Sequence, residues 1–309
     1  MTLILIIIIL TLALSYLGYC ITFKAPEHSD DDTPVLPKGG QYDTYHDIIE
    51  RCVNEMYARE YEPITIKSFD GKKLYARYYH VADNAPLQIQ MHGYKSTAFT
   101  DFCGGNKLAT KMGHNTLVVD QRSHGRSEGK TITFGVCERR DCLSWVEYAV
   151  NRFGNDTKII IDGLSMGAAT VLMAADQNLP ENVIGIMADC PFSSPKEIIK
   201  KVGKDRNYPP ALMYPFVKLG AKIYGHFNLE ESSAVEAVTK TKLPILIIHG
   251  EADGFVPCDM SRAIKAAGGD KIELHTFEKA DHALCYMVDP ERYEKIVKAF
   301  LNRILEKEE

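Results

Sequence analysis

Residues 158–169 read Lys158-Ile159-Ile160-Ile161-Asp162-Gly163-Leu164-Ser165-Met166-Gly167-Ala168-Ala169. The Ile-rich half predicts a buried strand, and the Ala-rich half predicts the start of a helix. The G-x-S-x-G pattern between them is typical of a sharp strand-to-helix turn on which the serine has strained backbone angles. Side chains two positions away on either side would clash, which explains Gly163 and Gly167. The Ser165 hydroxyl would then lie at a helix N-terminus, which favours a developing anion and therefore a nucleophile. The alternative is a glycine-rich turn without chemistry.

A nucleophilic serine needs a base, and the base needs a carboxylate to orient it. In folds with this turn the chain order is serine, acid, histidine. The apolar run Ile245–Ile248 predicts a later strand, and it leads into His249-Gly250-Glu251-Ala252-Asp253. Asp253 falls in the loop beyond that strand and is our candidate acid, because Glu251 belongs to the turn at the strand end. Asp189, which follows the preceding strand, is the alternative acid.

Two histidines follow Asp253 in the chain. His275 falls inside a predicted strand at 271–277, where a solvent-facing or hydrogen-bonded structural role is expected. His282 falls just beyond that strand, in a loop that can return over the sheet. We therefore expect His282 to be the base.

Acyl-transfer chemistry also needs hydrogen-bond donors for the oxyanion. The backbone N–H of Met166, directly after the nucleophile, is one candidate. The second is the N–H of Tyr94, in the loop His92-Gly93-Tyr94-Lys95-Ser96 that follows the predicted strand Leu87–Met91. His92 itself is expected to be structural.

Strand and helix patterns alternate along most of the chain, which predicts an α/β fold with a mainly parallel sheet. Two strands, at about 62–69 and 73–81, flank an Asp70-Gly71 turn and predict a hairpin. The further predicted strands are Leu87–Met91, Thr116–Val119, Lys158–Ile161, Val183–Met187, Ile245–Ile248 and Ile272–Phe277, and helices are predicted at 137–152, 166–178 and 290–306. About fifty residues separate two of these strands, so we expect a helical insertion at about 193–240 that either caps a pocket or only packs.

The amino-terminal segment differs from the rest. Residues 2–23 carry no charged side chain and are mostly Leu, Ile and Ala. A run of about 20 apolar residues can span a bilayer, so residues 1–23 predict a single-pass membrane anchor whose orientation stays open. A cleaved signal peptide is the alternative, although the basic residues that usually begin one are missing. Residues 24–60 predict a linker and an amphipathic helix, with Asp43 or Thr44 as its N-cap.

Composition excludes several classes of function. The 309 residues carry 36 Lys and Arg against 41 Asp and Glu, a formal charge of −5, so no nucleic-acid partner is expected. The eight cysteines include no CxxC pair, and no zinc site or disulfide scaffold is expected. The sequence contains no G-x-G-x-x-G motif, so no dinucleotide-binding site is expected.

These features together resemble the α/β-hydrolase superfamily over roughly residues 61–306, within a predicted domain at 61–309. The matching pieces are His92-Gly93, Asp120–Ser127, Gly163–Gly167, His249–Pro257 and Asp281-His282. Gly129–Gly135, Ala188–Phe192 and the apolar amino terminus narrow the resemblance to membrane-associated bacterial serine hydrolases described as serine aminopeptidase-like or esterase-like. The resemblance implies an eight-stranded sheet, a Ser165, Asp253 and His282 triad, and no cofactor or metal.

Three functions remain open. The first is hydrolysis of a small carboxylic ester through an acyl-enzyme on Ser165, or acyl transfer to another acceptor. The second is peptide or amide hydrolysis by the same triad, for which Glu230, Glu231 and Glu236 of the insertion could anchor a peptide terminus. The third is a non-catalytic scaffold, which would have no need of three such residues in that order. Oligomeric state is not indicated.

Overall fold

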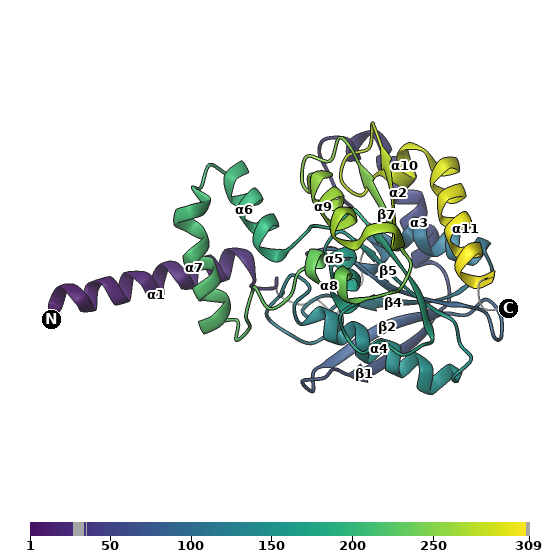
Figure 1. Ribbon diagram of the computed structural model, residues 1–309, viewed down its shortest axis with the longest axis horizontal. Coiled ribbons are helices and arrows are strands. Elements are labelled where there is room, and N and C mark those ends of the chain that lie inside the picture. The colour runs from purple at the N-terminus through teal and green to yellow at the C-terminus, as the bar shows by residue number, and fades with distance from the viewer. Residues whose placement is uncertain (27–33, 35, 307–309) are drawn as a thin grey trace.

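The computed structural model describes residues 1–26, 34 and 36–306. Its centre is an eight-stranded sheet with the strand order β1-β2-β4-β3-β5-β6-β7-β8 (Figure 1). The first three strands in this order pair antiparallel, and all later pairs are parallel. The prediction of a mostly parallel eight-stranded sheet is confirmed. The strands are β1 (Glu62–Lys67), β2 (Lys73–Tyr79), β3 (Leu87–Met91), β4 (Asn115–Asp120), β5 (Ile159–Leu164), β6 (Val183–Asp189), β7 (Ile245–Gly250) and β8 (Ile272–Phe277).

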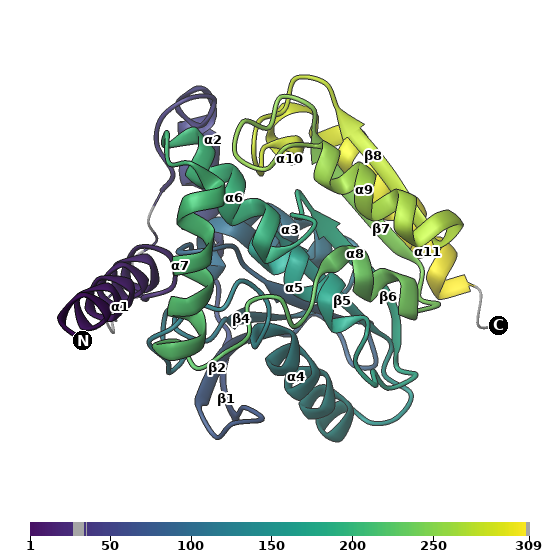
Figure 2. The same ribbon diagram turned by 60° about the vertical axis from the view of Figure 1, so that its left-hand side comes forward.

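Helices cover both faces of this sheet (Figures 1 and 2). One face carries α4 (Glu138–Phe153), α5 (Met166–Ala174), α8 (Ala234–Ala237) and α9 (Asp259–Gly268). The other carries α2 (Tyr42–Tyr57), α3 (Ala98–Lys111), α10 (Cys285–Val288) and α11 (Pro290–Glu306). The remaining helices are α1 (Thr2–Thr22), α6 (Pro195–Asp205) and α7 (Pro210–Ile223), with short 3-10 turns at Val238–Lys240 and Gly269–Lys271.

The apolar run of β5 is explained by these two helical layers. Ile159 and Ile161 pack in the core on the α5 side, whereas Ile160 packs with residues of α11 on the opposite side. A parallel strand buried on both faces needs such a continuous apolar run. The same alternation places Asp162, two residues after Ile160, on the α11 side of the sheet.

The turn after β5 has the strained geometry that its sequence predicts. Ser165 has φ 56° and ψ −113°, outside the common regions for a non-glycine residue. A Cβ on Gly167 would lie 1.7 Å from the carbonyl oxygen of Met91, and one on Gly163 would lie 2.3 Å from the backbone of Gly167. Both glycines are therefore required for the backbone segments of β3, β5 and α5 to approach one another.

The amino-terminal helix is joined to the body at its carboxyl end. In Figures 1 and 2, α1 extends away from the sheet, and its last turns lie beside α7. Small residues allow this contact: a Cβ on Gly220 would lie 2.3 Å from the carbonyl oxygen of Ser15. Phe23 is fully buried, and Lys24 forms a β-bridge with Thr131. The first residues of the predicted linker are thus part of the fold.

The structure differs from two local predictions, the N-cap of α2 and the last residue of α5. Helix α2 begins at Tyr42 with Gln41 as N-cap, so the expected N-cap role of Asp43 or Thr44 was wrong. The Asp43 carboxylate instead accepts a hydrogen bond from the N–H of Gly39, one turn earlier. Helix α5 ends at Ala174, four residues before its expected end. Most of the predicted linker, residues 27–33 and 35, lies outside the described residues.

We predict that Gly167→Ala destabilises the protein by more than about 3 kcal/mol or prevents folding, because the added methyl meets backbone rather than a side chain that can move. The measurement is the urea midpoint of unfolding. Gly113→Ala is the matched control, since a Cβ there meets nothing within 4 Å. Its cost is limited to about 1 kcal/mol of backbone strain at a positive φ. Equal midpoints for the two variants would contradict this explanation of the turn.

Candidate active site

Three side chains from three separate loops form one chain of hydrogen bonds. The Ser165 hydroxyl lies 2.9 Å from Nε2 of His282, and Nδ1 of His282 lies 2.7 Å from Oδ2 of Asp253. With the proton on Nδ1, His282 donates to the carboxylate and accepts from the serine. The structure therefore brings together the serine, histidine and acid singled out from the sequence.

The Asp253 carboxylate is held in its charged form. Its Oδ1 accepts hydrogen bonds from the N–H groups of Phe255 and Val256, at 2.9 and 2.7 Å. Burial alone would raise the pKa of Asp253, but its interactions with His249 and His282 lower that pKa below its ordinary value. A buried, ionised carboxylate beside Nδ1 fixes the tautomer and orientation of the imidazole.

The two expected oxyanion donors lie beside Ser165. Among the described residues, no backbone acceptor takes the N–H of either Tyr94 or Met166. The loop that carries Tyr94 approaches the serine closely, because a Cβ on Gly93 would lie 3.3 Å from the Cβ of Ser165. The N–H of Gly93 is already bound by the Asp101 carboxylate, at 2.6 Å, and so is not a third donor.

Two buried histidines form hydrogen bonds with the backbone of this loop. His92 contacts the carbonyl of Gly93 through Nδ1 and accepts from the N–H of Gln121 through Nε2. His124 accepts from the N–H of Lys95 at 3.0 Å. Both rings lie among backbone groups, and His92 has the structural position that we expected for it.

The side chains of the alternative acids and of the alternative base take no part in this chain of hydrogen bonds. Glu251 is ion-paired with Arg262, and His275 lies half-exposed, 3.8 Å from Glu273. Asp189 accepts a hydrogen bond from Tyr293 at 3.0 Å and none from a histidine in the described chain. In the described chain, none of these three side chains hydrogen-bonds to the Ser165 hydroxyl.

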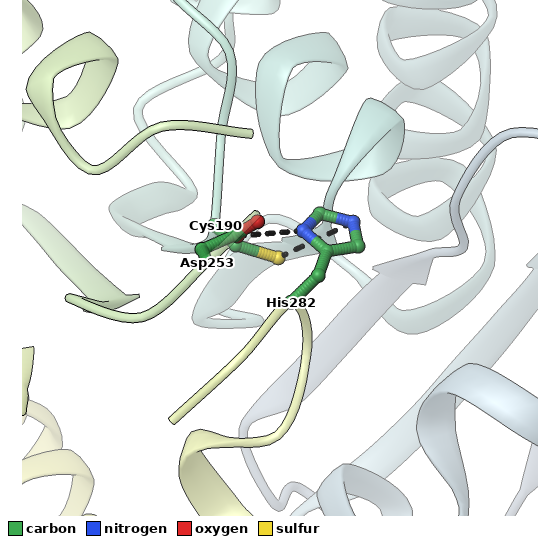
Figure 3. A group of neighbouring side chains, drawn as sticks. All are labelled: Cys190, Asp253 and His282. Atoms are coloured by element: carbon green, nitrogen blue, oxygen red, sulfur yellow. Dashed lines mark hydrogen bonds and ion pairs between the residues drawn. The ribbon is translucent and has the colours of Figure 1, made fainter. Parts of the chain in front are cut away.

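A cysteine that the sequence did not single out lies against the histidine. Figure 3 shows Cys190, Asp253 and His282 together, and Cys190 Sγ lies 4.0 Å from Nε2 of His282. The potential ligand atoms of this trio lie within 4.8 Å of one another. Burial raises the pKa of the Cys190 thiol well above its ordinary value. A protonated thiol is a poor metal ligand, and His282 Nδ1 is engaged by Asp253, so the trio fits a hydrogen-bonded site better than a metal centre.

Ser165 opens into a cavity of about 310 Å³. Its walls come from the segment 36–49, the loop 93–96, helix α3, the ends of β5 and β6, the loop 282–284 and helices α10 and α11. No residue between 193 and 240, all of which the structure describes, lines this cavity. A larger hollow of about 740 Å³ lies by the amino ends of β6 and β8 and does not include Ser165.

The three glutamates of the insertion that could have anchored a peptide lie outside this cavity. Glu230 pairs with Lys218 and Lys196, and Glu231 pairs with Arg139 and Arg140. Glu236, the third of them, is exposed. The insertion therefore supplies no carboxylate to the cavity.

Helix α2 contributes more to the site than its sequence indicated. The Tyr42 hydroxyl donates to the backbone carbonyl of His282 at 2.8 Å. The Gln41 side chain bonds both the carbonyl of Lys279 and the N–H of Asp281. The start of α2 thus holds the loop that carries His282 in place through these three hydrogen bonds. The sequence predicted an amphipathic helix here, but nothing in its pattern indicated which loop the start of the helix would contact.

Comparison with known proteins agrees with this architecture. Residues 93–223 match a family model described as alpha/beta hydrolase fold, and residues 211–305 match one described as the dienelactone hydrolase family. This chain has the α/β-hydrolase fold. The superfamily resemblance expected from the sequence is therefore confirmed.

Relatives and solved structures show how far the similarity extends. The chain is 28% identical over 229 residues to YqkD of Bacillus subtilis, covering 73% of this chain and 75% of that protein. It is 26% identical to protein bem46 of Schizosaccharomyces pombe over 54% of this chain and 52% of that one. An esterase of Pyrococcus furiosus superposes with a TM-score of 0.68 at 22% identity, covering 91% of this chain and 98% of that one. At 22% identity, this superposition shows that the two chains share a fold and nothing more.

Two further carboxyl groups border the cavity, on the α11 side of the sheet. Asp162 of β5 and Asp189 at the end of β6 both line it. Burial and the nearby Asp189 carboxyl raise the pKa of Asp162 to about 7. Burial raises the pKa of Asp189 to about 6, although the Tyr293 hydroxyl acts in the opposite direction.

These shifts predict how stability changes with pH. Because the folded state raises both pKa values above the unfolded values of about 4, the folded protein binds more protons, and stability falls as pH rises from about 4 to 7. We predict that Asp162→Asn raises the melting temperature at pH 8 more than at pH 4.5. Asp83→Asn changes a side chain that is 95% exposed and is the control. It is expected to leave the melting temperature unchanged at both pH values. An equal gain for Asp162→Asn at both pH values would contradict the assignment.

Proposed function

We propose that this protein is a serine hydrolase that cleaves carboxylic esters through an acyl-enzyme on Ser165. The observation that carries the proposal is the hydrogen-bonded chain from Ser165 through His282 to Asp253. The Ser165 oxygen attacks the ester carbonyl while Nε2 of His282 takes its proton. The C–O bond to the alcohol then breaks, and His282 returns the proton to the departing oxygen.

The second half of the reaction releases the acid. Water attacks the acyl-enzyme carbonyl, His282 takes the proton from the water, and Ser165 leaves as the protonated alcohol. The N–H groups of Met166 and Tyr94 are the proposed donors to the oxyanion in both tetrahedral intermediates. Such donors are each worth about 3 kcal/mol of transition-state stabilisation in comparable sites.

Amide or peptide hydrolysis by the same three residues is the second candidate. It requires protonation of a poorer leaving group, which His282 would also supply. The carboxyl groups of Asp162 and Asp189 in the cavity favour substrates that carry an amine, whether ester or amide. The scaffold alternative has no specific observation in its favour.

Labelling of the full-length protein with a fluorophosphonate probe tests the nucleophile. We predict stoichiometric labelling of the wild type and none of Ser165→Ala, because the probe reacts with serines activated by a base. Ser144→Ala changes a half-buried serine on α4 whose hydroxyl donates to the Arg140 carbonyl, and this variant is expected to label like the wild type. Labelling that survives Ser165→Ala would show that another residue is the nucleophile.

We propose further that α1 is a retained membrane anchor. It is the one helix among the described residues that is long and apolar enough to cross a membrane, a property that signal sequences share. Retention is supported by its contacts. Tyr19 and Phe23 are buried against the body, and the Tyr94 hydroxyl donates to the carbonyl of Thr22 at 2.9 Å. A segment removed by processing has no need of such contacts.

A pair of alanine variants distinguishes a retained membrane anchor from a cleaved signal peptide. We predict that Phe23→Ala in detergent lowers the free energy of unfolding by about 3 kcal/mol, because it empties a fully buried aromatic site. Leu5→Ala, on the exposed part of α1, is expected to leave it unchanged. Mass spectrometry of the purified protein should find the amino-terminal residues still attached. A shortened chain, or a stable Phe23→Ala, would favour the signal peptide.

A further inference from the structure

The Asp162 and Asp189 carboxyl groups occupy the inner end of the cavity beside Ser165. Asp189 pairs in register with Leu164, and its backbone carbonyl accepts the N–H of Ser165 at 2.8 Å. Asp162 lies on the neighbouring strand β5, two residues before Leu164, and its side chain is on the same face of the sheet as that of Asp189. Both residues also border a smaller inner space of about 20 Å³, whose remaining lining comes from Gln88, Tyr293 and mostly apolar residues of α3, β6, β7 and α11. The pair therefore lies next to the nucleophile at the junction of the two spaces.

One oxygen of this pair lacks a partner. Asp189 is 8% exposed, and its Oδ2 accepts from Tyr293. Its Oδ1 is buried and accepts no hydrogen bond from any described residue. In the part of the chain that the structure describes, neither Asp162 nor Asp189 forms an ion pair with a lysine or an arginine. Two other buried aspartates, Asp120 and Asp141, are each paired with an arginine.

Two neighbouring buried carboxyl groups without a cation are costly in their charged form. Burial and the Asp189 carboxyl raise the pKa of Asp162 to about 7, so the pair does not carry two full negative charges at neutral pH. A bound cation removes this cost and also satisfies the free Oδ1. The inner space of about 20 Å³ has room for one water-sized group, which matches an ammonium head.

We infer that this pair is the binding subsite for a primary ammonium group of the substrate. The preferred substrates are thus small amine-bearing esters or amides, with the amine a few bonds from the reacting carbonyl. This inference rests on the proposed hydrolysis at Ser165 and names the substrate class of that site. The ammonium group donates to Oδ1 of Asp189 and to the Asp162 carboxylate, while the Tyr293 hydroxyl keeps the Asp189 side chain in place.

Matched substrate pairs test the inference on either side of the scissile bond. The acyl pair is the 4-nitrophenyl esters of leucine and of 4-methylpentanoate, which differ by the amine alone. The alcohol pair is 2-aminoethyl butanoate and propyl butanoate. Each kcat/KM is divided by the rate constant for uncatalysed hydrolysis of the same ester under the assay conditions, which removes the intrinsic effect of the amine on the reactivity of the ester. We expect the full-length wild type to prefer the amine member of at least one pair by about tenfold or more, since hydrogen bonds to charged groups contribute about that much.

Asparagine variants then assign the preference to the pair. Asp189→Asn and Asp162→Asn should each bring the ratio close to one. Glu230→Gln, which removes an insertion acid outside the cavity, should leave the ratio as in the wild type. A wild-type ratio near one, or a ratio that survives both asparagine variants, would overturn the inference. So would a dependence of neutral-ester hydrolysis on K⁺ or Na⁺ that these variants abolish, because an inorganic cation would then occupy the site.

The fluorophosphonate probe separates this failure from failure of the proposed function. It carries no amine, so labelling of Ser165 does not depend on the carboxyl pair. Normal labelling without amine preference would overturn the subsite alone, whereas loss of labelling in the folded wild type would overturn the hydrolase itself. A melting-temperature increase with propylammonium chloride that is absent in Asp189→Asn gives a readout that does not need catalysis.

Discussion

The contact between Gly167 and the carbonyl oxygen of Met91 is the constraint on which the rest of the site depends. With no side chain at position 167, α5 begins directly against the end of β3. This approach places Ser165 at the head of α5 and beside the loop that carries Gly93 and Tyr94. A single backbone contact thus positions the proposed nucleophile relative to both proposed oxyanion donors. The strained angles of Ser165 are tolerated because the surrounding sheet and helices over-determine them.

The site is also connected to the amino-terminal helix. The backbone N–H of Tyr94 is the second proposed oxyanion donor, and the Tyr94 side chain packs against Phe134 and donates to the carbonyl of Thr22. Phe134 in turn contacts Phe23 edge to face. The last turn of α1 and the proposed oxyanion loop therefore share one packed cluster. A protein held in a membrane by α1 would have its active-site loop in a fixed position relative to that membrane.

Much of this arrangement could be predicted from the sequence because it depends on local pattern. The strand, the two glycines and the serine are contiguous, and Asp253 and His282 follow later strand ends in the expected order. Long-range docking could not be predicted in this way. Tyr42 is 240 residues from His282 in the chain, yet its hydroxyl bonds the His282 carbonyl. Asp162 lies inside the very stretch that predicted the fold, but its neighbour Asp189 is defined only by the register of β5 and β6, which shifts at Ile159 and Ile160. The ion pairs of Glu230 with lysine and of Glu231 with arginine join distant parts of the chain, and the sequence pattern did not indicate them.

The central claim is that Ser165 forms a covalent acyl intermediate. Rapid mixing with excess 4-nitrophenyl acetate, followed by acid quench, trypsin digestion and fragment-ion mass spectrometry, tests it most directly. The account predicts a burst of one equivalent of 4-nitrophenol per protein and one acetyl group on the tryptic peptide 159–196, located by fragmentation at Ser165. Turnover with no burst and no acetylated Ser165, or an acetyl group on another residue of that peptide such as Cys190, would contradict it.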